Sequence, residues 1–443
     1  MMNTPICDFV RGYTKEKATR LHMPGHKGRG GFCEEYDITE IDGADVLYSA
    51  DGIIEESQRN ASKLFGSGAT FYSCEGSSLC IRAMLYLALI SSDKKSRRVL
   101  AARNAHKTFL SAAALLDLEI DWIYGVGECV ISSSVTAKDI EYQLENMDTM
   151  PIAVYITSPD YLGNTADISS IAKVCHSFGV MLIVDNAHGA YLNFLEKSLH
   201  PISLGADMCC DSAHKTLPVL TGGAYLHISK NADDILVKNA KRAMSMFAST
   251  SPSYLILQSL DRANMYMATL YKNELCECAR KTRKLKEYMN DKGFELVGDE
   301  EIKITLRPKS FGYTGYELYS ILREQGIVCE FADKDHLVMM LTPALDDCDY
   351  EKIYASLAGI DRRPCIDELP PKICIPKVAM TPRQAMECDF EILPANDCSG
   401  RILACDCVSC PPAIPIVACG EIIDKQAIKL FEYYGIDSLK VIL

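Results

Sequence analysis

Short apolar runs that alternate with helical patterns between residues 77 and 230 constrain the fold of this chain most strongly. Six of these runs have the length and apolar character of short strands, and several are apolar at nearly every position. They cover residues 98–102, 120–125, 152–158, 180–185, 206–211 and 223–229. Continuous apolarity is typical of strands buried on both faces. Because helical patterns separate the runs, we expect an α/β fold with a largely parallel sheet flanked by helices.

The pattern changes after this region. From Pro252 to Asp291 apolar residues recur at three- and four-residue spacing, which predicts a long connecting helix. A strand, a helix and two further strands are predicted between residues 304 and 342. A chain of 443 residues exceeds what one core comfortably fills. We therefore predict two domains: residues 1–290, with an N-terminal segment, a large domain and the connecting helix, and residues 291–443, a smaller α+β domain.

Charge and composition narrow the classes of partner. The net charge of -13 disfavours nonspecific binding to nucleic acid or to an anionic membrane. The first twenty residues lack the pattern of a secretory signal, and no apolar run approaches the length of a membrane span. Twenty cysteines without an export signal favour reduced thiols over a disulfide framework. We expect a cytoplasmic protein with no nucleic-acid or membrane partner.

Two charged residues follow neighbouring strands of the expected sheet. Asp185 ends the apolar run VMLIVD, and Lys215 follows the next strand. In such a sheet ligands gather beyond the carboxyl ends of the strands. Each residue alone has an ordinary explanation, a helix cap for Asp185 and a solvated amine for Lys215. Together they suit a ligand with a basic ring nitrogen on one side and an aldehyde on the other, and pyridoxal phosphate is such a ligand.

Pyridoxal phosphate also requires a site for its phosphate. Gly76, Ser77 and Ser78 stand at the start of an apolar helix, where free N–H groups and the helix dipole favour an anion. Gly-Ser before a helix is also common capping chemistry, so this signal is weak alone. His106, in ARNAHKT, follows another strand, and its imidazole could stack on a cofactor ring.

These motifs, in this order, resemble the pyridoxal-phosphate-dependent ornithine/lysine/arginine decarboxylases in their shorter bacterial form. That resemblance implies a fold-type-I large domain, as in aspartate aminotransferase, and decarboxylation of arginine, lysine or ornithine to the corresponding polyamine-pathway amine. The likeness runs through most of the chain. It rests on LHMPGHKGRG, DITEIDGADVLYSADGIIEESQ, EGSS, ARNAHKT, TSPDYLGNTADI, VDNAHGAY, DSAHKTLPVLTGGAYL, STSPSY, GRI and CPPAIPIVACGE.

The resemblance implies roles for the matching residues around the cofactor ring. Lys215 would be the Schiff-base lysine, and Asp185 would keep the pyridine nitrogen protonated. His106 would stack on one face of the ring and Ala187 would pack against the other. Either His188 or Lys215 would supply the proton that replaces the lost carboxylate.

The same resemblance implies the phosphate contacts. Ser77, Ser78, Ser212 and His214 would bind the phosphate beside Gly76. In this family the TSP motif, here Thr250 and Ser251, reaches the phosphate of the neighbouring subunit, which implies a homodimer.

The chain departs from the family pattern at positions that bear on the substrate. Asn186 stands where an acidic residue is usual, Tyr191 where a histidine is common, and the terminal motif has Cys410, Ala413 and Cys419 as unusual residues. The distal group of a basic amino acid requires a carboxylate, bidentate for a guanidinium. Glu330 and Asp333 are the candidates, although a solvated strand edge explains them equally well.

Three alternatives stay open. Another fold-type-I enzyme, such as an aminotransferase or an acyl-transferring synthase, would keep the fold and cofactor and change the reaction. An inactive regulatory homologue would keep neither cofactor nor reaction. Cys405, Cys407 and Cys410 include one CxxC, but the second spaced pair of a structural zinc site is missing, so we expect no metal.

Overall fold

The computed structural model describes residues 2–92, 96–125, 135–372, 375–405, 407–409 and 415–443. Seven strands form the largest sheet, in the order β1-β7-β6-β5-β4-β2-β3. Their bounds are Ala69–Ser73 (β1), Arg98–Ala102 (β2), Glu119–Ile123 (β3), Ala153–Thr157 (β4), Met181–Asp185 (β5), Met208–Asp211 (β6) and Ala224–Ile228 (β7). The pairs β5–β6 and β2–β3 are parallel, whereas β7 runs antiparallel to both β1 and β6. All six predicted strands exist, and the predicted α/β class is confirmed.

The helices precede, separate and follow these strands. They are Pro5–Lys15 (α1), Ile53–Phe65 (α2), Gly76–Ser91 (α3), Lys107–Leu116 (α4), Ala137–Glu145 (α5), Ile168–Ser177 (α6), Pro201–Leu204 (α7), Ala213–Thr216 (α8), Asp234–Ser245 (α9), Tyr254–Met267 (α10), Tyr271–Lys292 (α11), Gly315–Glu324 (α12), Asp347–Ala358 (α13), Pro382–Glu387 (α14) and Lys425–Tyr434 (α15). The single connecting helix predicted from Pro252 to Asp291 is therefore two helices, α10 and α11.

The chain divides into two compact units. The first comprises Met1–Ser96, Ile152–Val154 and Ile168–Asn273, and the second comprises Arg97–Pro151, Tyr155–Asp167 and Glu274–Leu443. Both units are discontinuous in sequence because the chain passes between them several times. The domain boundary that we place near residue 290 stays a prediction.

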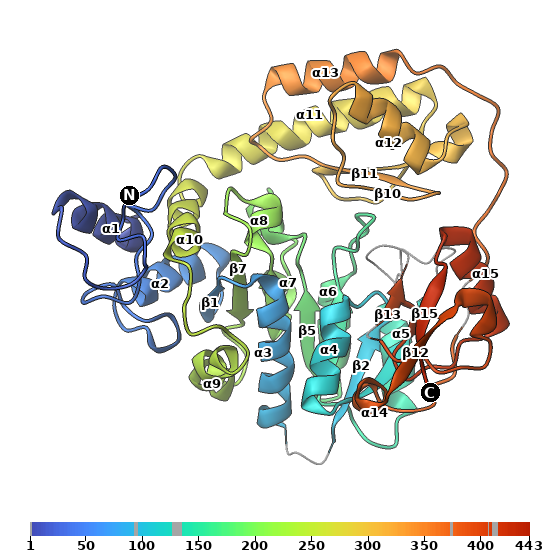
Figure 1. Cartoon of the computed structure of the whole chain (residues 1–443), viewed down its shortest axis with the longest axis horizontal. Helices are drawn as coiled ribbons and strands as arrows, with labels where there is room; N and C mark the ends of the chain where they lie inside the picture. Colours follow the sequence, from blue (N-terminus) through green and yellow to red (C-terminus); the bar gives the residue numbers. More distant parts are fainter. Residues whose placement is uncertain (1, 93–95, 126–134, 373–374, 406, 410–414) are drawn as a thin grey trace. The chain divides into compact units, whose positions relative to one another are not determined.

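Helix α3 packs against several elements of the first unit. Its interior is almost wholly apolar, and Leu79, Cys80, Ile81, Met84 and Leu85 are buried. It packs against β1, β5, β6, β7 and α9 (Figure 1). A helix that is apolar around most of its circumference is stable only when other elements cover it. The start of α3 is thereby fixed beside the ends of these strands.

The second unit contains a small four-stranded antiparallel sheet in the order β10-β11-β9-β8. Its strands are Glu295–Val297 (β8), Lys303–Arg307 (β9), Phe331–Ala332 (β10) and Leu337–Met340 (β11). Helix α12 packs against β10 and β11, and Figure 1 shows α11 and α13 on the same side. The predicted smaller α+β region is present. Two further pairs lie nearer the C-terminus: Phe390–Pro394 (β12) with Ser438–Ile442 (β15), and Cys407–Ser409 (β13) with Pro415–Ala418 (β14).

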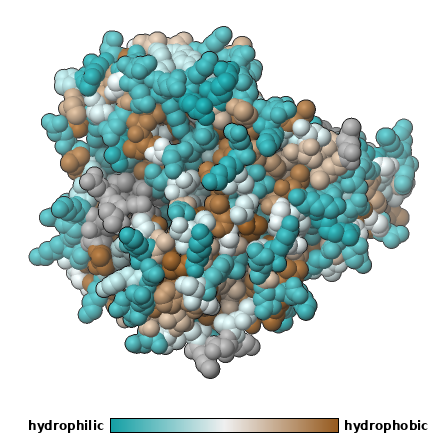
Figure 2. All heavy atoms as spheres, turned by 180° about the vertical axis from the view of Figure 1, so that it is seen from behind, coloured by the Kyte–Doolittle hydropathy of each residue, from teal (hydrophilic) through white to brown (hydrophobic). Residues whose placement is uncertain are grey.

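Hydrophilic residues cover much of the face shown in Figure 2, with apolar residues scattered among them. Among the described residues, no helix is both long enough and apolar enough to cross a membrane.

A buried carboxylate joins three helices of the first unit. Oδ2 of Asp261, in α10, accepts hydrogen bonds from the backbone N–H groups of Ile6 and Cys7 at 3.1 and 3.0 Å, in the first turn of α1. Its Oδ1 accepts from Ser57 of α2 at 2.6 Å. Thr4, at the N-cap of α1, makes no side-chain cap. Asp261 therefore supplies the cap from outside the helix, where a negative charge also suits the helix dipole.

Replacement of Asp261 by asparagine should change how stability depends on pH. Burial, only partly offset by these hydrogen bonds, raises the pKa of Asp261 to about 6. Its unfolded pKa is near 3.9, so between these values the folded state binds more protons and wild type loses stability as pH rises. The variant should lack this loss, which is on the order of 2–3 kcal/mol. Urea unfolding at pH 4 and pH 7 gives the free energy of unfolding of each protein. If wild type and the variant lose the same stability between these two pH values, the assignment is contradicted.

Candidate functional site

Three predicted residues lie at the carboxyl ends of two adjacent parallel strands in the first unit. Asp185 ends β5 and pairs in register with Cys210 of β6, and Lys215 lies in α8, four residues beyond the end of β6. The Nζ atom of Lys215 is 2.9 Å from Nε2 of His188. Asp185 and His188 are 2% and 6% exposed. The structure therefore brings the amine of Lys215 into direct contact with an imidazole at this end of the sheet.

One oxygen of the Asp185 carboxylate accepts hydrogen bonds from two donors. Its Oδ1 accepts from the backbone N–H of Ala187 at 3.2 Å and from the thiol of Cys210 at 3.6 Å. Burial and the charge of Asp185 raise the pKa of Cys210, which keeps that sulfur protonated as a donor. Cys210 therefore contributes a hydrogen bond to the site.

The predicted phosphate turn is shaped by glycines. Gly76 has φ +69°, and a Cβ added there would meet nothing within 4 Å, so the space beside the start of α3 is open. The N–H of Gly76 donates to the carbonyl of Gly222 at 2.7 Å. A Cβ on Gly222, which has φ +97°, would meet the Cys74 carbonyl oxygen at 2.7 Å. Gly222 is thus required for a close backbone approach that the sequence alone did not reveal.

Hydroxyl groups from two segments meet beside this turn. Ser212 donates to Oγ of Ser77 at 2.8 Å, which joins the residue after β6 to the first turn of α3. The first N–H groups of a helix have no partner within it, so this turn can bind an anion. Ser78 follows Ser77 in the same turn. The structure therefore brings Gly76, Ser77, Ser78 and Ser212 together.

The remaining predicted residues of the first unit have other contacts. Nδ1 of His214 donates to the Gly223 carbonyl at 3.0 Å, which fixes the ring against the strand that follows. Thr250 and Ser251 are exposed and lie between α9 and α10. Oε1 of Glu75 accepts from the backbone N–H of Ser249 at 2.6 Å and so ties this loop to the phosphate turn. Glu75 is a further residue whose role the sequence did not indicate.

His106 lies in the second unit, at the N-cap of α4. Its Nδ1 accepts from the backbone N–H of Thr108 at 3.2 Å and lies 2.9 Å from that residue's hydroxyl. Because Nδ1 accepts this hydrogen bond, the neutral ring carries its proton on Nε2. The capping contact fixes the orientation of the ring.

The two acids proposed for the substrate differ in the structure. The buried Asp333 carboxylate accepts from the backbone N–H groups of Asp335 and His336 at 2.7 and 2.5 Å. Glu330 is exposed and accepts from the hydroxyl of Tyr161 at 3.2 Å. Only Glu330 therefore presents a carboxylate that solvent can reach.

The cysteine group near the C-terminus is only partly described. Cys405 is half-buried, no side-chain detail is described for Cys407, and Cys410 lies outside the described residues. The expectation that this group binds no metal therefore stays a prediction.

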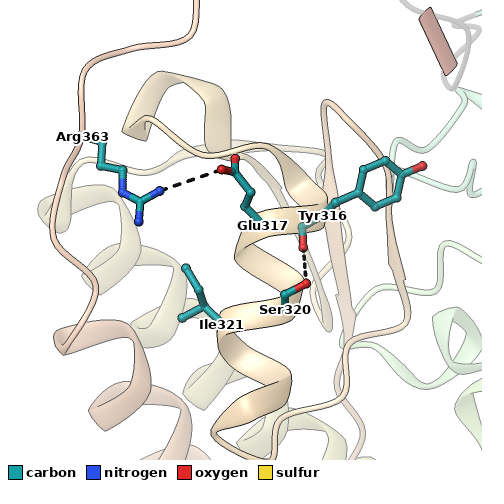
Figure 3. A pocket seen from close by; sticks show the side chains of 5 residues that line it. All are labelled: Tyr316, Glu317, Ser320, Ile321 and Arg363. Atoms are coloured by element: carbon teal, nitrogen blue, oxygen red, sulfur yellow. Dashed lines mark hydrogen bonds and ion pairs between the residues drawn. The ribbon is translucent and has the colours of Figure 1, made fainter. Parts of the chain in front are cut away.

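A shallow pocket of about 360 Å³ lies in the second unit, on α12 (Figure 3). Four of its residues, Tyr316, Glu317, Ser320 and Ile321, come from that helix, and Arg363 faces them. Glu317 accepts from the N–H of Thr314 at 2.7 Å as part of a capping box and pairs with Arg363 at 3.9 Å. Both charged side chains therefore have a structural role, in the helix cap and the ion pair. The pocket contains no predicted site residue.

Family comparisons agree with this arrangement. The model described as "Orn/Lys/Arg decarboxylase, major domain" matches residues 4–306, and "Orn/Lys/Arg decarboxylase, C-terminal domain" matches residues 369–437. The chain belongs to the Orn/Lys/Arg decarboxylase family. The predicted family is confirmed, and with it the predicted class of enzyme, a decarboxylase.

Individual relatives extend over nearly the whole chain. An arginine decarboxylase of Bacillus subtilis is 29% identical over 468 residues, covering 96% of this chain and 92% of the relative. One from Halalkalibacterium halodurans is 29% identical and covers 96% and 91%. Among solved structures, a Francisella novicida lysine decarboxylase has a TM-score of 0.84 at 16% identity, covering 100% of this chain and 81% of that one. The constitutive lysine decarboxylase of E. coli has a TM-score of 0.80 at 17% identity, covering 100% and 82%. These structures support the fold.

The residues of the first unit fit a phosphorylated aldehyde cofactor. An amine, a buried carboxylate and an open glycine turn with serine hydroxyls lie at one end of the sheet. Lys215 can carry the aldehyde, Asp185 can pair with a ring nitrogen, and the Ser77–Ser212 turn can hold the phosphate.

Proposed function

We propose that this protein decarboxylates a basic amino acid with pyridoxal phosphate, and that arginine is its substrate. The contact of Lys215 with His188, next to Asp185 at the end of β5, is the observation that carries the proposal. Arginine is preferred because the curated relatives that match nearly the whole chain are named arginine decarboxylases. Lysine and ornithine are the other candidates.

When bound, the cofactor supplies an electron sink for the pair of electrons left at the substrate α-carbon when CO2 departs. Asp185 would stabilise a positive charge on the ring nitrogen and so keep this sink effective. Ala187 and His106 would pack against the faces of the ring. His214 would contribute to phosphate binding through its position beside Lys215.

His188 and Lys215 would handle the proton that replaces the carboxylate. Their nitrogens lie at hydrogen-bonding distance, so a proton can pass directly between Nζ and Nε2. Glu330 is proposed to bind the distal cation of the substrate, because its carboxylate is exposed and oriented by Tyr161. Asp333 is the weaker candidate because its carboxylate is fully buried and one of its oxygens already accepts from two backbone donors.

The proposal includes a cytoplasmic homodimer. The support is the resemblance, in which Thr250 and Ser251 reach the phosphate of the partner subunit, together with their exposure in this structure. Light scattering on the purified protein should give twice the mass of one chain, and a monomer that is fully active would contradict this part of the proposal.

A substrate panel tests the reaction. Purified protein incubated with pyridoxal phosphate should show the visible absorbance of a lysine-bound cofactor and should release CO2 and the matching amine from arginine, more slowly or not at all from lysine and ornithine. Absorbance without CO2 release from any of the three would favour an aminotransferase or acyl-transferring synthase. A protein that never acquires the absorbance would favour a regulatory homologue.

A further inference from the structure

A buried group of polar residues lies at the end of β6, next to the candidate site in the first unit. Asp211, the last residue of β6, is 0% exposed. Its Oδ2 lies 3.0 Å from Nε2 of His200 and 3.2 Å from Nε2 of His227, and its Oδ1 accepts from Nδ2 of Asn186 at 2.6 Å. Since a carboxylate can only accept, both imidazoles must carry their proton on Nε2.

These contacts keep Asp211 charged. Burial would raise its pKa, but the two imidazoles more than offset this effect and hold the pKa of Asp211 well below its usual range. Nδ1 of His227 accepts from the hydroxyl of Thr70 at 2.8 Å, which fixes that tautomer. The group is thus a buried anion surrounded by donors, as a stable buried charge requires.

Asn186 connects this anion to the site. It follows Asp185 directly, and its backbone N–H donates to the Cys210 carbonyl at 3.0 Å while its amide donates to Asp211. Its carbonyl accepts from the N–H of Gly189 at 2.8 Å. A Cβ at Gly189 would meet Oδ1 of Asn186 at 2.0 Å, so this turn closes tightly over the amide.

The Asn186 side chain therefore holds the turn from Asp185 to Gly189 in place. The same turn carries His188, which contacts Lys215. Asp211 is also followed directly by Ser212, which contacts Ser77 of the phosphate turn. The Asp211 carboxylate thus contacts the turn that carries His188 and directly precedes the segment that carries Ser212.

We propose that Asp211 and Asn186 form the positioning pair of this site: the buried carboxylate fixes the Asn186 amide, and the amide fixes the turn that carries Asp185 and His188. This inference rests on the proposed function, because it assumes that this turn is part of the cofactor site. The pair also accounts for Asn186 where the family usually has an acidic residue, because the neighbouring strand supplies the negative charge.

A metal ion is the competing explanation for the same residues. Ligand atoms of His200, Cys209 and Asp211 lie within 4.8 Å of one another, all fully buried. The hydrogen bonds to Asp211 already satisfy its carboxylate without an ion, which favours the positioning pair. Stoichiometric zinc in the purified protein, measured by elemental analysis, would overturn the proposal.

A reciprocal exchange tests the pair. Asn186→Asp places two carboxylates at the separation of the present hydrogen bond, where like charges repel. Asp211→Asn removes the anion. In Asn186→Asp/Asp211→Asn the amide of residue 211 donates to the carboxylate of residue 186, and its oxygen still accepts from both imidazoles. Each single variant should weaken binding of pyridoxal phosphate about 10- to 100-fold, and the double variant should recover most of the loss.

Absorbance titration with pyridoxal phosphate gives the affinity, and thermal unfolding without cofactor gives the stability of each variant. Asn264→Asp is the matched control, because Asn264 is also a fully buried amide of the first unit and hydrogen-bonds to Ser57 and Tyr72 instead. It should lose stability and keep its affinity.

The outcomes separate this inference from the proposed function. Wild type that fails to bind the cofactor would end the proposed function itself. Wild type that binds, with single variants that bind equally well, would overturn only the positioning pair. Loss in the single variants without recovery in the double variant would also count against it, since a generally damaged core gives that result.

Discussion

Lys215→Ala should abolish the borohydride-reducible link between this protein and pyridoxal phosphate and lower kcat/KM at least about 10³-fold. Lys215 is proposed both to hold the cofactor aldehyde and to share a proton with His188 at 2.9 Å. Loss of a positioned proton donor alone typically lowers a rate 10²- to 10⁴-fold. Because removal of one member of a catalytic unit disables the others, the two losses should not simply multiply.

Mass spectrometry after borohydride reduction measures the link directly. Wild type should gain the mass of one reduced pyridoxal phosphate per chain, on a peptide that contains Lys215, and the variant should gain none. Lys230→Ala is the matched control, since Lys230 is an exposed lysine that follows β7 in the same unit. An adduct at Lys230, or an unmodified wild type with full activity, would contradict the assignment of Lys215.

The strands were the most predictable part of this fold. The run at residues 98–102 coincides with β2, because its last four residues are apolar and buried, as expected of a strand covered on both faces. The extent of the long helical pattern was less predictable. Helices α10 and α11 share one apolar periodicity, so the sequence shows no interruption between Met267 and Tyr271.

The two strand pairs near the C-terminus were not predicted either. Phe390 and Ile392 of β12 are exposed, so their pattern does not indicate a buried face. β12 exists because it pairs with β15, almost fifty residues later in the chain. Pairing of this kind depends on tertiary contacts that local propensity does not encode.

The candidate site shows the same division. The sequence predicted that Asp185 and Lys215 follow adjacent parallel strands, and the structure places them there, while their roles stay predictions. Gly222 and Asn186 were not assigned roles, because each acts through a partner distant in sequence, the Cys74 carbonyl and the Asp211 carboxylate. Composition and spacing show which groups are present, but only the fold shows which of them meet.

The second large effect is expected from a buried ion pair in the second unit. Arg103, in the ARNAHKT motif, donates to both carboxylate oxygens of Glu421, in the terminal motif, at 2.5 and 2.7 Å. Its Nε donates to the Pro415 carbonyl at 3.1 Å, and its guanidinium lies 4.8 Å from the centre of the Trp122 ring. Both side chains are at most 3% exposed. The pair thus fixes the terminal segment to the chain just before His106.

Glu421→Ala should lower the free energy of unfolding by about 3–5 kcal/mol, because it leaves the Arg103 guanidinium buried without its counter-charge. Arg103→Met should have a similar effect through the orphaned carboxylate. The double variant Arg103→Met/Glu421→Met should recover much of this loss, since apolar side chains of similar size can replace a buried pair. Urea unfolding of the four proteins gives the coupling energy.

Glu277→Ala is the control, because it breaks an exposed pair with Arg280 in the same unit. It should change the free energy of unfolding little. A coupling energy near zero between Arg103 and Glu421 would show that other contacts hold the His106 turn.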